Sequence, residues 1–176
     1  MAVELSTLDL LDELSAERLG QHGFAAEPLT LEITESSLLS DVPRVLAAIG
    51  HLHWLGVSLS LDDFGTGYSS LSYLRRLPLS ELKIDLSFIA DILHEAHEAH
   101  DDEIVKSTID LGRNLGVRVV AGGIENSEVM NRLIEVGCHV AQGYGISRPL
   151  EVQEFDTWLA STSWRVPRIG RNPARN

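Results

Sequence analysis

Short apolar runs alternate along the chain with longer segments in which apolar residues recur at helical spacing. The runs with strand character are Ala2–Leu5, Leu29–Thr34, Val57–Leu61, Leu82–Ile84, Val117–Ala121 and His139–Gln142. The segments with helical spacing are Leu8–His22, Pro43–Leu55, Ser69–Arg76, Glu103–Leu115, Ser127–Val136 and Glu151–Leu159. Strands that alternate with helices predict parallel βαβ units, arranged either as a doubly wound sheet or as a barrel.

The positions of the polar residues distinguish these two arrangements. Glu32 lies near the end of its predicted strand, Asp62 and Asp63 directly follow theirs, Lys83 lies within the next, and Gln142 ends another. Polar side chains at the carboxyl ends of several parallel strands are typical of the active site of a (β/α) barrel. A Rossmann-type sheet would carry a glycine-rich phosphate loop after its first strand, and this sequence has none there. We therefore predict an α/β barrel.

The segment Leu61–Ser70 carries the clearest candidate chemistry. Asp62 and Asp63 stand side by side, and Gly65–Gly67 reads Gly-Thr-Gly. Two neighbouring carboxylates repel each other unless a cation or hydrogen bonds offset their charge, and carboxylate oxygens are ligands that hard divalent cations prefer. The glycines allow a tight loop over a bound group. A metal site is one interpretation, and an acidic turn that caps the following helix is the other.

Composition narrows the possible partners. The 176 residues, 44% of them hydrophobic, suit one domain with a sizeable core. A formal net charge of −12 argues against nucleic acid as a partner. One cysteine, Cys138, excludes a disulfide framework and indicates a reducing compartment. The sequence has neither an apolar run of about 18 residues nor a signal-peptide pattern, so we expect a cytoplasmic protein that does not enter the membrane.

Five linked motifs make the chain similar to a known family. They are Leu31–Ser36, Asp62–Ser70, Leu82–Ile89, Val119–Glu125, and Gln142–Tyr144 with Ser147–Pro149. Their sequences and their order resemble the EAL family of cyclic-di-GMP phosphodiesterases. The resemblance covers residues 2 to 160 and implies a (β/α)8 barrel that cleaves cyclic-di-GMP to linear pGpG with Mg²⁺ or Mn²⁺.

The resemblance also implies roles for individual residues. Glu32, Asp62 and Asp63 fall on the family's metal-binding carboxylates. Lys83 falls on a lysine near the attacking water, and Gln142 falls on a glutamine that lines the site. Glu35 falls on the glutamate that holds the Gly-Thr-Gly loop. In such a site two cations about 3.5–4 Å apart activate a water and stabilise the charge that develops on the attacking and leaving oxygens.

Two positions depart from the family pattern. The strand Ala2–Leu5 resembles the family's Val-Asn-Leu-Ser strand, but Glu4 replaces its metal-binding asparagine. Gly122 replaces the first glutamate of the family's Val-Ala-Glu-Gly-Val-Glu motif, and Glu125, three residues further on, does not substitute for it. With Glu32, Asp62, Asp63 and Glu4 as remaining ligands, we predict weak binding of a single Mg²⁺ or Mn²⁺. We expect little or no hydrolysis.

The family's Glu-Ala-Leu signature does not precede Ala2 in this sequence. We therefore expect an incomplete TIM-like (β/α)8 barrel of the EAL type that lacks the first strand and helix. The open edges of such a barrel would need a protein partner or a second copy to cover them. Residues 1–160 are predicted to form this partial domain, and residues 161–176 a disordered basic tail.

Two functions follow from these expectations, and a decayed fragment with no role is a third possibility. The first is a degenerate EAL domain that acts in cyclic-di-GMP signalling by binding the nucleotide or a protein. The second is an active phosphodiesterase that a partner chain or a preceding segment completes. Outside the motifs, the histidines of His94-Glu-Ala-His97-Glu-Ala-His100 suggest either a transition-metal patch or a solvated linker.

Overall fold

The computed structural model describes residues 2–4, 29–39, 41–66, 71–90, 92 and 100–162. The predicted helix Leu8–His22, the side chains of the three clustered histidines and the predicted tail from residue 163 onward lie outside the described residues. None of the helices within this part of the chain is long and apolar enough to cross a membrane.

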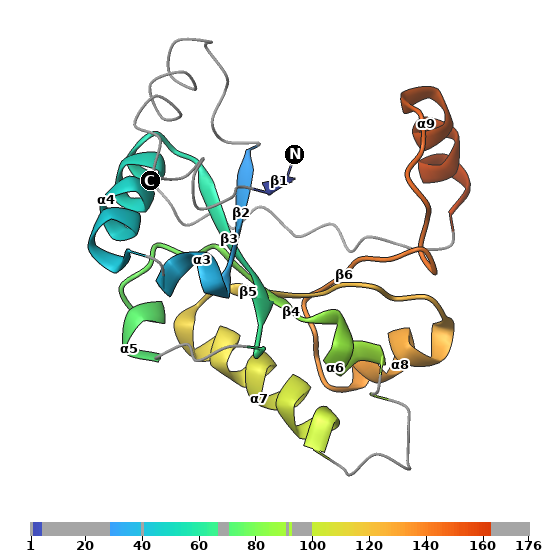
Figure 1. The fold of residues 1–176 in the computed structure, drawn as a ribbon. Coiled ribbons are helices and arrows are strands. Elements are labelled where there is room, and N and C mark those ends of the chain that lie inside the picture. The colour runs from blue at the N-terminus through green and yellow to red at the C-terminus, as the bar shows by residue number, and fades with distance from the viewer. Residues whose placement is uncertain are drawn as a thin grey trace, which may run out of the picture.

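The centre of the molecule is one sheet of parallel strands, arranged in the order in which they follow one another along the chain. The strands are β1 (Ala2–Glu4), β2 (Thr30–Thr34), β3 (Ser58–Phe64), β4 (Glu81–Ile84), β5 (Arg118–Ala121) and β6 (Val140–Ala141). A doubly wound sheet would reverse its strand order at a switch point, and this sheet does not. Among the described strands, β1 and β6 each have one neighbour, so the sheet is an open, incomplete TIM-like barrel (Figure 1). The predicted fold class is confirmed.

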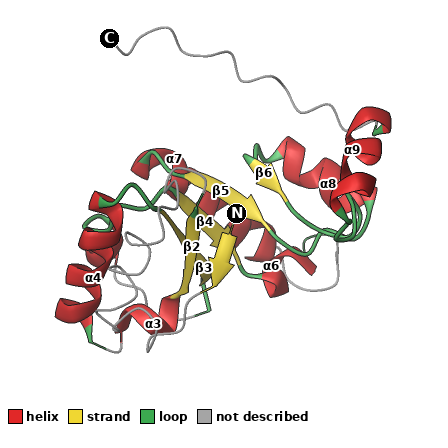
Figure 2. Ribbon diagram, turned by 90° about the horizontal axis from the view of Figure 1, so that it is seen from above, coloured by secondary structure: helices red, strands yellow, loops and turns green. Residues whose placement is uncertain are grey.

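Helices follow most of these strands. They are α3 (Glu35–Leu39), α4 (Val42–Trp54), α5 (Leu71–Leu74), α6 (Leu86–Ala90), α7 (His100–Leu115), α8 (Ser127–Glu135) and α9 (Val152–Ser161). Side chains cap α4 and α8: Asp41 accepts a hydrogen bond from the backbone N–H of Arg44 before α4, and Asn126 accepts one from Val129 before α8. Seen from above, α3 and α4 lie beside β2 and β3, and α7 lies against β4 and β5 (Figure 2).

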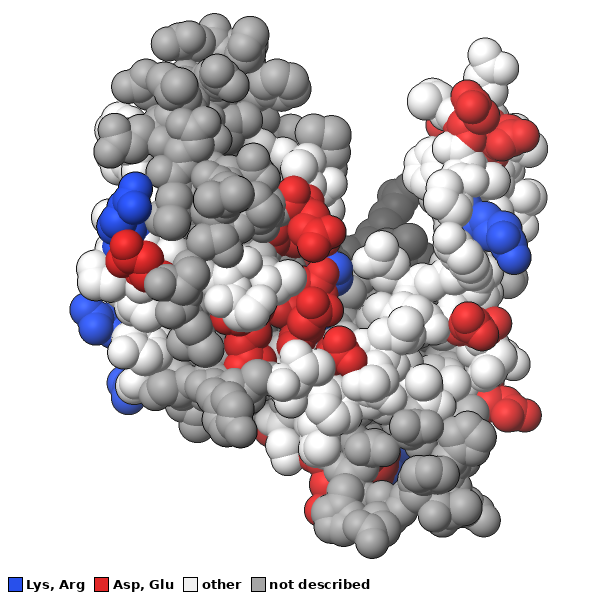
Figure 3. Space-filling view, viewed as in Figure 1, with Lys and Arg blue, Asp and Glu red and all other residues white. Residues whose placement is uncertain are grey.

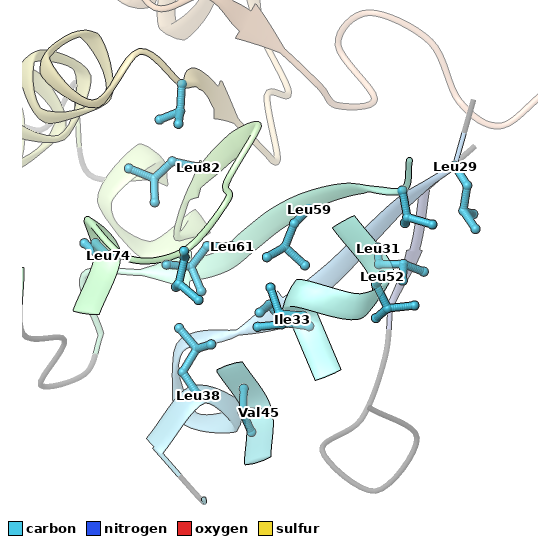
Figure 4. Packing of buried hydrophobic residues seen from close by; sticks show 14 residues of the cluster. Leu29, Leu31, Ile33, Leu38, Val45, Leu52, Leu59, Leu61, Leu74 and Leu82 are labelled. Carbon is cyan, nitrogen blue, oxygen red and sulfur yellow. The ribbon is translucent and has the colours of Figure 1, made fainter. Parts of the chain in front are cut away.

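Alternation along the strands divides the sheet into an apolar face and a polar face. In β2, Leu31 and Ile33 are buried while Glu32 between them is half-buried on the other side. The apolar face of β2 and β3 packs with α4 in one core cluster (Figure 4). Its buried residues are Leu29, Leu31, Ile33, Leu38, Val45, Ile49, Leu52, Val57, Leu59, Leu61, Leu74, Leu77, Leu82 and Val117.

A second core cluster continues under β4 and β5. It holds buried residues from β4, β5, α6, α7, α8 and the segments between them, namely Ile84, Ile89, Ile92, Val105, Ile109, Val119, Ala121, Ile124, Val129, Met130 and Leu133. Each large apolar side chain that is fully buried contributes about 1.5–3 kcal/mol relative to an exposed one. Because both clusters lie on the helix side, the opposite face of the sheet is left for polar side chains.

The helix α9 differs from the others because none of its residues is buried. In Figure 1 it stands apart from the sheet, at the end of the long segment that follows β6. Its apolar residues Val152, Phe155 and Leu159 are all exposed, and the rings of Phe155 and Trp158 lie 5.9 Å apart.

Candidate functional site

A lysine joins two carboxylates on the polar face of the sheet. The Nζ atom of Lys83 lies 2.5 Å from Oδ2 of Asp62 and 3.1 Å from Oε2 of Glu32. The three side chains come from the neighbouring strands β2, β3 and β4, and between 14% and 21% of each is exposed. The structure therefore brings together three of the residues that the sequence singled out.

This contact keeps the lysine charged. Burial lowers the pKa of Lys83, but the hydrogen bonds to Asp62 and Glu32 and the charges of both carboxylates outweigh it and raise the pKa above its ordinary value. A half-buried ammonium between two carboxylates is a charge-assisted arrangement, in which each hydrogen bond is stronger than one between neutral groups.

The end of β3 is irregular, and this irregularity positions the acidic pair. The predicted strand ended at Leu61, but the observed strand continues through Asp62 and Asp63 to Phe64. Its register with β4 shifts between Leu61 and Phe64, and Asp63 has φ = 55°, in the left-handed region. Successive residues of a regular strand face opposite sides of the sheet, so such a bulge changes where the second carboxylate points.

Asp63 lies among other carboxyl groups. Its pKa is raised first by burial and then by the negative charges of Asp62, Asp85 and Glu4, while the charge of Lys83 lowers it. Five carboxyl groups therefore share this end of the sheet with one ammonium, because Glu32 belongs to the group through Lys83. Figure 3 shows acidic side chains gathered along the middle of this face, beside a hollow that opens toward α9.

Asp85 is a member of this group that the sequence reasoning did not single out. Its Oδ1 atom accepts hydrogen bonds from the backbone N–H of Ser87, at 2.8 Å, and from the Ser87 hydroxyl, so Asp85 caps the short helix α6. The sequence did carry a signal for Asp85, because this residue directly follows β4. The other candidates were singled out because they too stand at the carboxyl ends of strands.

Glu35 contacts the glycine loop directly. Only 3% of this residue is exposed, and its Oε2 atom accepts a hydrogen bond from the backbone N–H of Gly65 at 3.3 Å. Gly65 has φ = 107°, and a Cβ atom there would lie 2.8 Å from the ring of Phe88. The loop therefore needs glycine at this position, and Glu35 ties it to the start of α3.

Gln142 is held by its backbone. Its N–H donates to the carbonyl of Ala121, and its carbonyl accepts from the N–H of Ile124. Its side chain is exposed, and no hydrogen bond links this side chain to Lys83 or to the carboxylates within the described part of the chain. The structure thus places Gln142 at the end of β6 without joining its side chain to the acidic group.

Gly122, directly after β5, leaves open space. A Cβ atom built at this position would meet nothing within 4 Å, and the backbone there does not require glycine. Gly123, by contrast, has φ = 70°, and a Cβ atom there would lie 1.8 Å from the side chain of Leu86.

The donor set suits a hard cation in its chemistry but is not arranged as a metal site. Among residues 2–4, 29–39, 41–66, 71–90, 92 and 100–162, no three His, Cys, Asp or Glu side chains are grouped so that they could hold a metal ion. All the acidic groups nevertheless offer oxygen, and Asp63 lies among the negative charges of Asp62, Asp85 and Glu4. The chemistry of these donors therefore fits a hard cation such as Mg²⁺ or Mn²⁺.

Comparison with known proteins identifies the family. A family model described as the EAL domain matches residues 1–149. The chain belongs to the EAL domain family. Cyclic di-GMP phosphodiesterase NbdA from Pseudomonas aeruginosa is 44% identical over 158 residues, which are 90% of this chain and 20% of NbdA. The chain therefore spans about a fifth of the length of this curated relative, and the activity of the whole relative does not carry over directly.

Solved EAL structures share the fold. The PaMucR phosphodiesterase in its c-di-GMP complex matches with a TM-score of 0.79 and 39% identity, over 88% of this chain and 63% of that one. Klebsiella pneumoniae BlrP1, in a manganese and cy-diGMP complex, matches with a TM-score of 0.74 and 29% identity, over 84% of this chain and 38% of BlrP1. Relatives of this EAL chain thus bind the cyclic dinucleotide, and one of them does so with a divalent metal.

Proposed function

We propose that this EAL domain binds cyclic-di-GMP in signalling and hydrolyses it little or not at all. The observation that carries the proposal is Gly122. It stands where the family motif has a glutamate, and no side chain of the described residues would lie within 4 Å of a Cβ atom there. The site therefore lacks one carboxylate of a two-metal centre, and a two-metal mechanism depends on both cations to stabilise the attacking and leaving oxygens.

The charge of the site makes nucleotide binding depend on a cation. Five carboxyl groups and one ammonium leave an excess of negative charge, which repels a dinucleotide with two phosphates. One Mg²⁺ or Mn²⁺ held by Asp62 and Asp63, with Glu32 and Glu4 as further ligands, would neutralise part of that charge and offer a positive centre to a phosphate oxygen.

In this proposal three further residues of the site support the bound nucleotide. Lys83 lies at the carboxylates and, once a cation has taken them, would be free to hold a water or a phosphate oxygen. Glu35 keeps the glycine loop in place through Gly65. Gln142, with an exposed side chain at the end of β6, is free to line the bound nucleotide.

Calorimetric titration with cyclic-di-GMP in Ca²⁺, followed by a hydrolysis assay in Mn²⁺, tests the proposal. We expect binding that disappears when EDTA removes the cation, and turnover near background. Asp62→Asn should abolish binding. Asp110→Asn, which changes an exposed aspartate paired with Arg113 on α7, is the matched control and should bind normally. Rapid hydrolysis by the chain would contradict the proposal, and so would the absence of binding.

The exposed edges of the sheet favour a second candidate, an active phosphodiesterase completed by a partner chain. Val3 of β1 and Val140 of β6 are each 37% exposed, and the described strands leave both edges without a further neighbour. Unpaired edges invite another strand. A protein partner or a second copy would cover them, and hydrolysis that appears only after such a partner is added would favour this candidate.

We also propose a cytoplasmic location for the chain, as its single cysteine suggests. Cys138, its single cysteine, is half-buried, and burial raises the pKa of its thiol, so the residue is suited to staying reduced and unreactive.

A further inference from the structure

We propose that the ammonium of Lys83 competes with a divalent cation for the carboxylates of Glu32 and Asp62, so that this lysine sets how tightly the site binds metal. The inference rests on the proposed function only in assuming that a cation belongs to this site. It gives Lys83 a role as an internal cation that holds the acidic group together when no metal is bound.

The contacts of Asp62 are the first reason. Its Oδ2 atom lies 2.5 Å from Nζ of Lys83, and its Oδ1 atom accepts a hydrogen bond from the backbone N–H of Asp63 at 2.9 Å. Both oxygens of the carboxylate are therefore engaged. A divalent cation takes several oxygen ligands at about 2.0–2.6 Å and cannot share an oxygen closely with an ammonium, because the two positive charges repel each other.

Glu32 repeats the pattern. Its Oε2 atom lies 3.1 Å from the same Nζ atom, so one ammonium bridges carboxylates on two neighbouring strands. A cation that used Glu32 and Asp62 together would need the position that Lys83 takes. The described residues contain no ready metal-binding group, although five carboxyl groups lie at one end of the sheet.

The negative charges of the remaining carboxylates would attract a metal ion to the site. Asp63 lies close to Asp62, Asp85 and Glu4, and among the described residues Lys83 offsets part of this negative charge. A divalent cation entering between Asp62 and Asp63 would relieve their repulsion, which Lys83 relieves only in part. The ammonium of Lys83 and a divalent metal ion would thus neutralise the same excess negative charge, one in place of the other.

The neighbouring strand β5 offers Lys83 no carboxylate at Gly122. Lys83 lies opposite Val120 in the register between β4 and β5, and Gly122 follows the end of β5. Gly122 offers no side chain, and the space in front of it is open. Among the described residues, the carboxylate partners of Lys83 are Glu32 and Asp62.

A comparison of the two lysine variants tests the competition, because Lys83 and Lys106 are the only lysines of the chain. Metal affinity is measured by calorimetry with Mn²⁺ and with Ca²⁺ alone, without nucleotide, and as the metal-induced shift in Tm. We expect Lys83→Met to melt lower than the unchanged protein without metal and to bind Mn²⁺ at least about tenfold more tightly. Lys106→Met removes a pair with Asp102 on α7 and should leave metal affinity unchanged.

A charge-preserving variant keeps the test decisive if Lys83→Met does not fold. Lys83→Arg retains a cation at the carboxylates and should bind Mn²⁺ no more tightly than the unchanged protein. Equal or weaker metal binding by Lys83→Met would overturn the proposal, as would a gain in affinity for Lys83→Arg. Tighter metal binding by Lys83→Met without any cyclic-di-GMP binding would support the competition and contradict the proposed function, so the two can fail separately.

Discussion

The carboxylate of Glu35 accepts a hydrogen bond from the backbone N–H of Gly65, thirty residues further along the chain. This bond connects the first turn of α3 with the loop that follows the acidic pair of β3. A nearly fully buried carboxylate is costly without a donor, so the position of the loop and the charge of Glu35 depend on each other.

Removing this acceptor should loosen the loop. Glu35→Ala leaves the N–H of Gly65 without its partner, and we expect the free energy of unfolding to fall by about 1–3 kcal/mol in urea titrations. Cyclic-di-GMP binding should weaken as well. Glu35→Gln keeps an acceptor oxygen and serves as the control, with a smaller loss in both measurements. Equal effects of the two variants would show that the hydrogen bond to Gly65 is not the cause.

Neighbouring glycines should respond in opposite ways to the same substitution. Gly122→Ala meets open space, so we expect the free energy of unfolding to change by less than about 0.5 kcal/mol. Gly123→Ala combines a positive φ with a contact of 1.8 Å to Leu86 and should cost more than about 1 kcal/mol. Thermal melts of the two variants give the comparison, and a large loss for Gly122→Ala would mean that the space is not open.

Gly122→Glu extends the same argument to activity. The glutamate should be accommodated without loss of stability, yet hydrolysis in Mn²⁺ should stay near background, since Glu4 still replaces the family's asparagine and Lys83 still occupies two carboxylates. The measurement is conversion of cyclic-di-GMP to pGpG followed by chromatography. Strong activity in this single variant would show that Gly122 alone had silenced the site.

Charge removal at Asp63 should separate stability from metal binding. Asp63→Asn relieves repulsion from Asp62, Asp85 and Glu4, and asparagine tolerates the left-handed backbone at φ = 55°. We expect a higher Tm without metal and a smaller metal-induced shift in Tm. Asp110→Asn on α7 is the control for a general charge effect and should change neither value. A lower Tm for metal-free Asp63→Asn would contradict the repulsion argument.

A salt bridge between α7 and α8 predicts how stability depends on pH. The Nε and Nη2 atoms of Arg132 donate to the two carboxylate oxygens of Asp102 at 3.0 and 2.6 Å, and these hydrogen bonds hold the pKa of Asp102 below its usual range. Because the folded-state pKa is the lower one, the stabilisation is present above the unfolded pKa of about 3.9 and is lost as the pH falls through the folded value.

The variant Asp102→Asn isolates this contribution. It should lower the free energy of unfolding by on the order of 1 kcal/mol at pH 7, since both partners are partly exposed. The difference from the unchanged protein should stay constant down to about pH 4 and shrink below it. Urea titrations at several pH values measure this, and a difference that grows toward low pH would contradict the assignment.

Hydrophobic periodicity was sufficient to predict most elements of the fold. Runs such as Leu29–Thr34 and Val117–Ala121 lead to the strands β2 and β5 within one residue at each end, because alternation and β-branched residues are local signals. The short helices α3 and α6 were missed, since five residues are too few to show a helical period. The bulge that extends β3 through Asp63 comes from pairing with β4, which no local pattern reveals.

For the site, the sequence by itself determined which chemical groups are present and at which strand ends they stand. Glu32, Asp62, Asp63 and Lys83 could be predicted to approach one another, because parallel strands bring their carboxyl ends to one edge. Only the tertiary structure decided which of the carboxylates pair with Lys83. The register of β2, β3 and β4 places one ammonium between Glu32 and Asp62 and leaves Asp63 among carboxylates, since hydrogen bonds depend on distances that chain order does not specify.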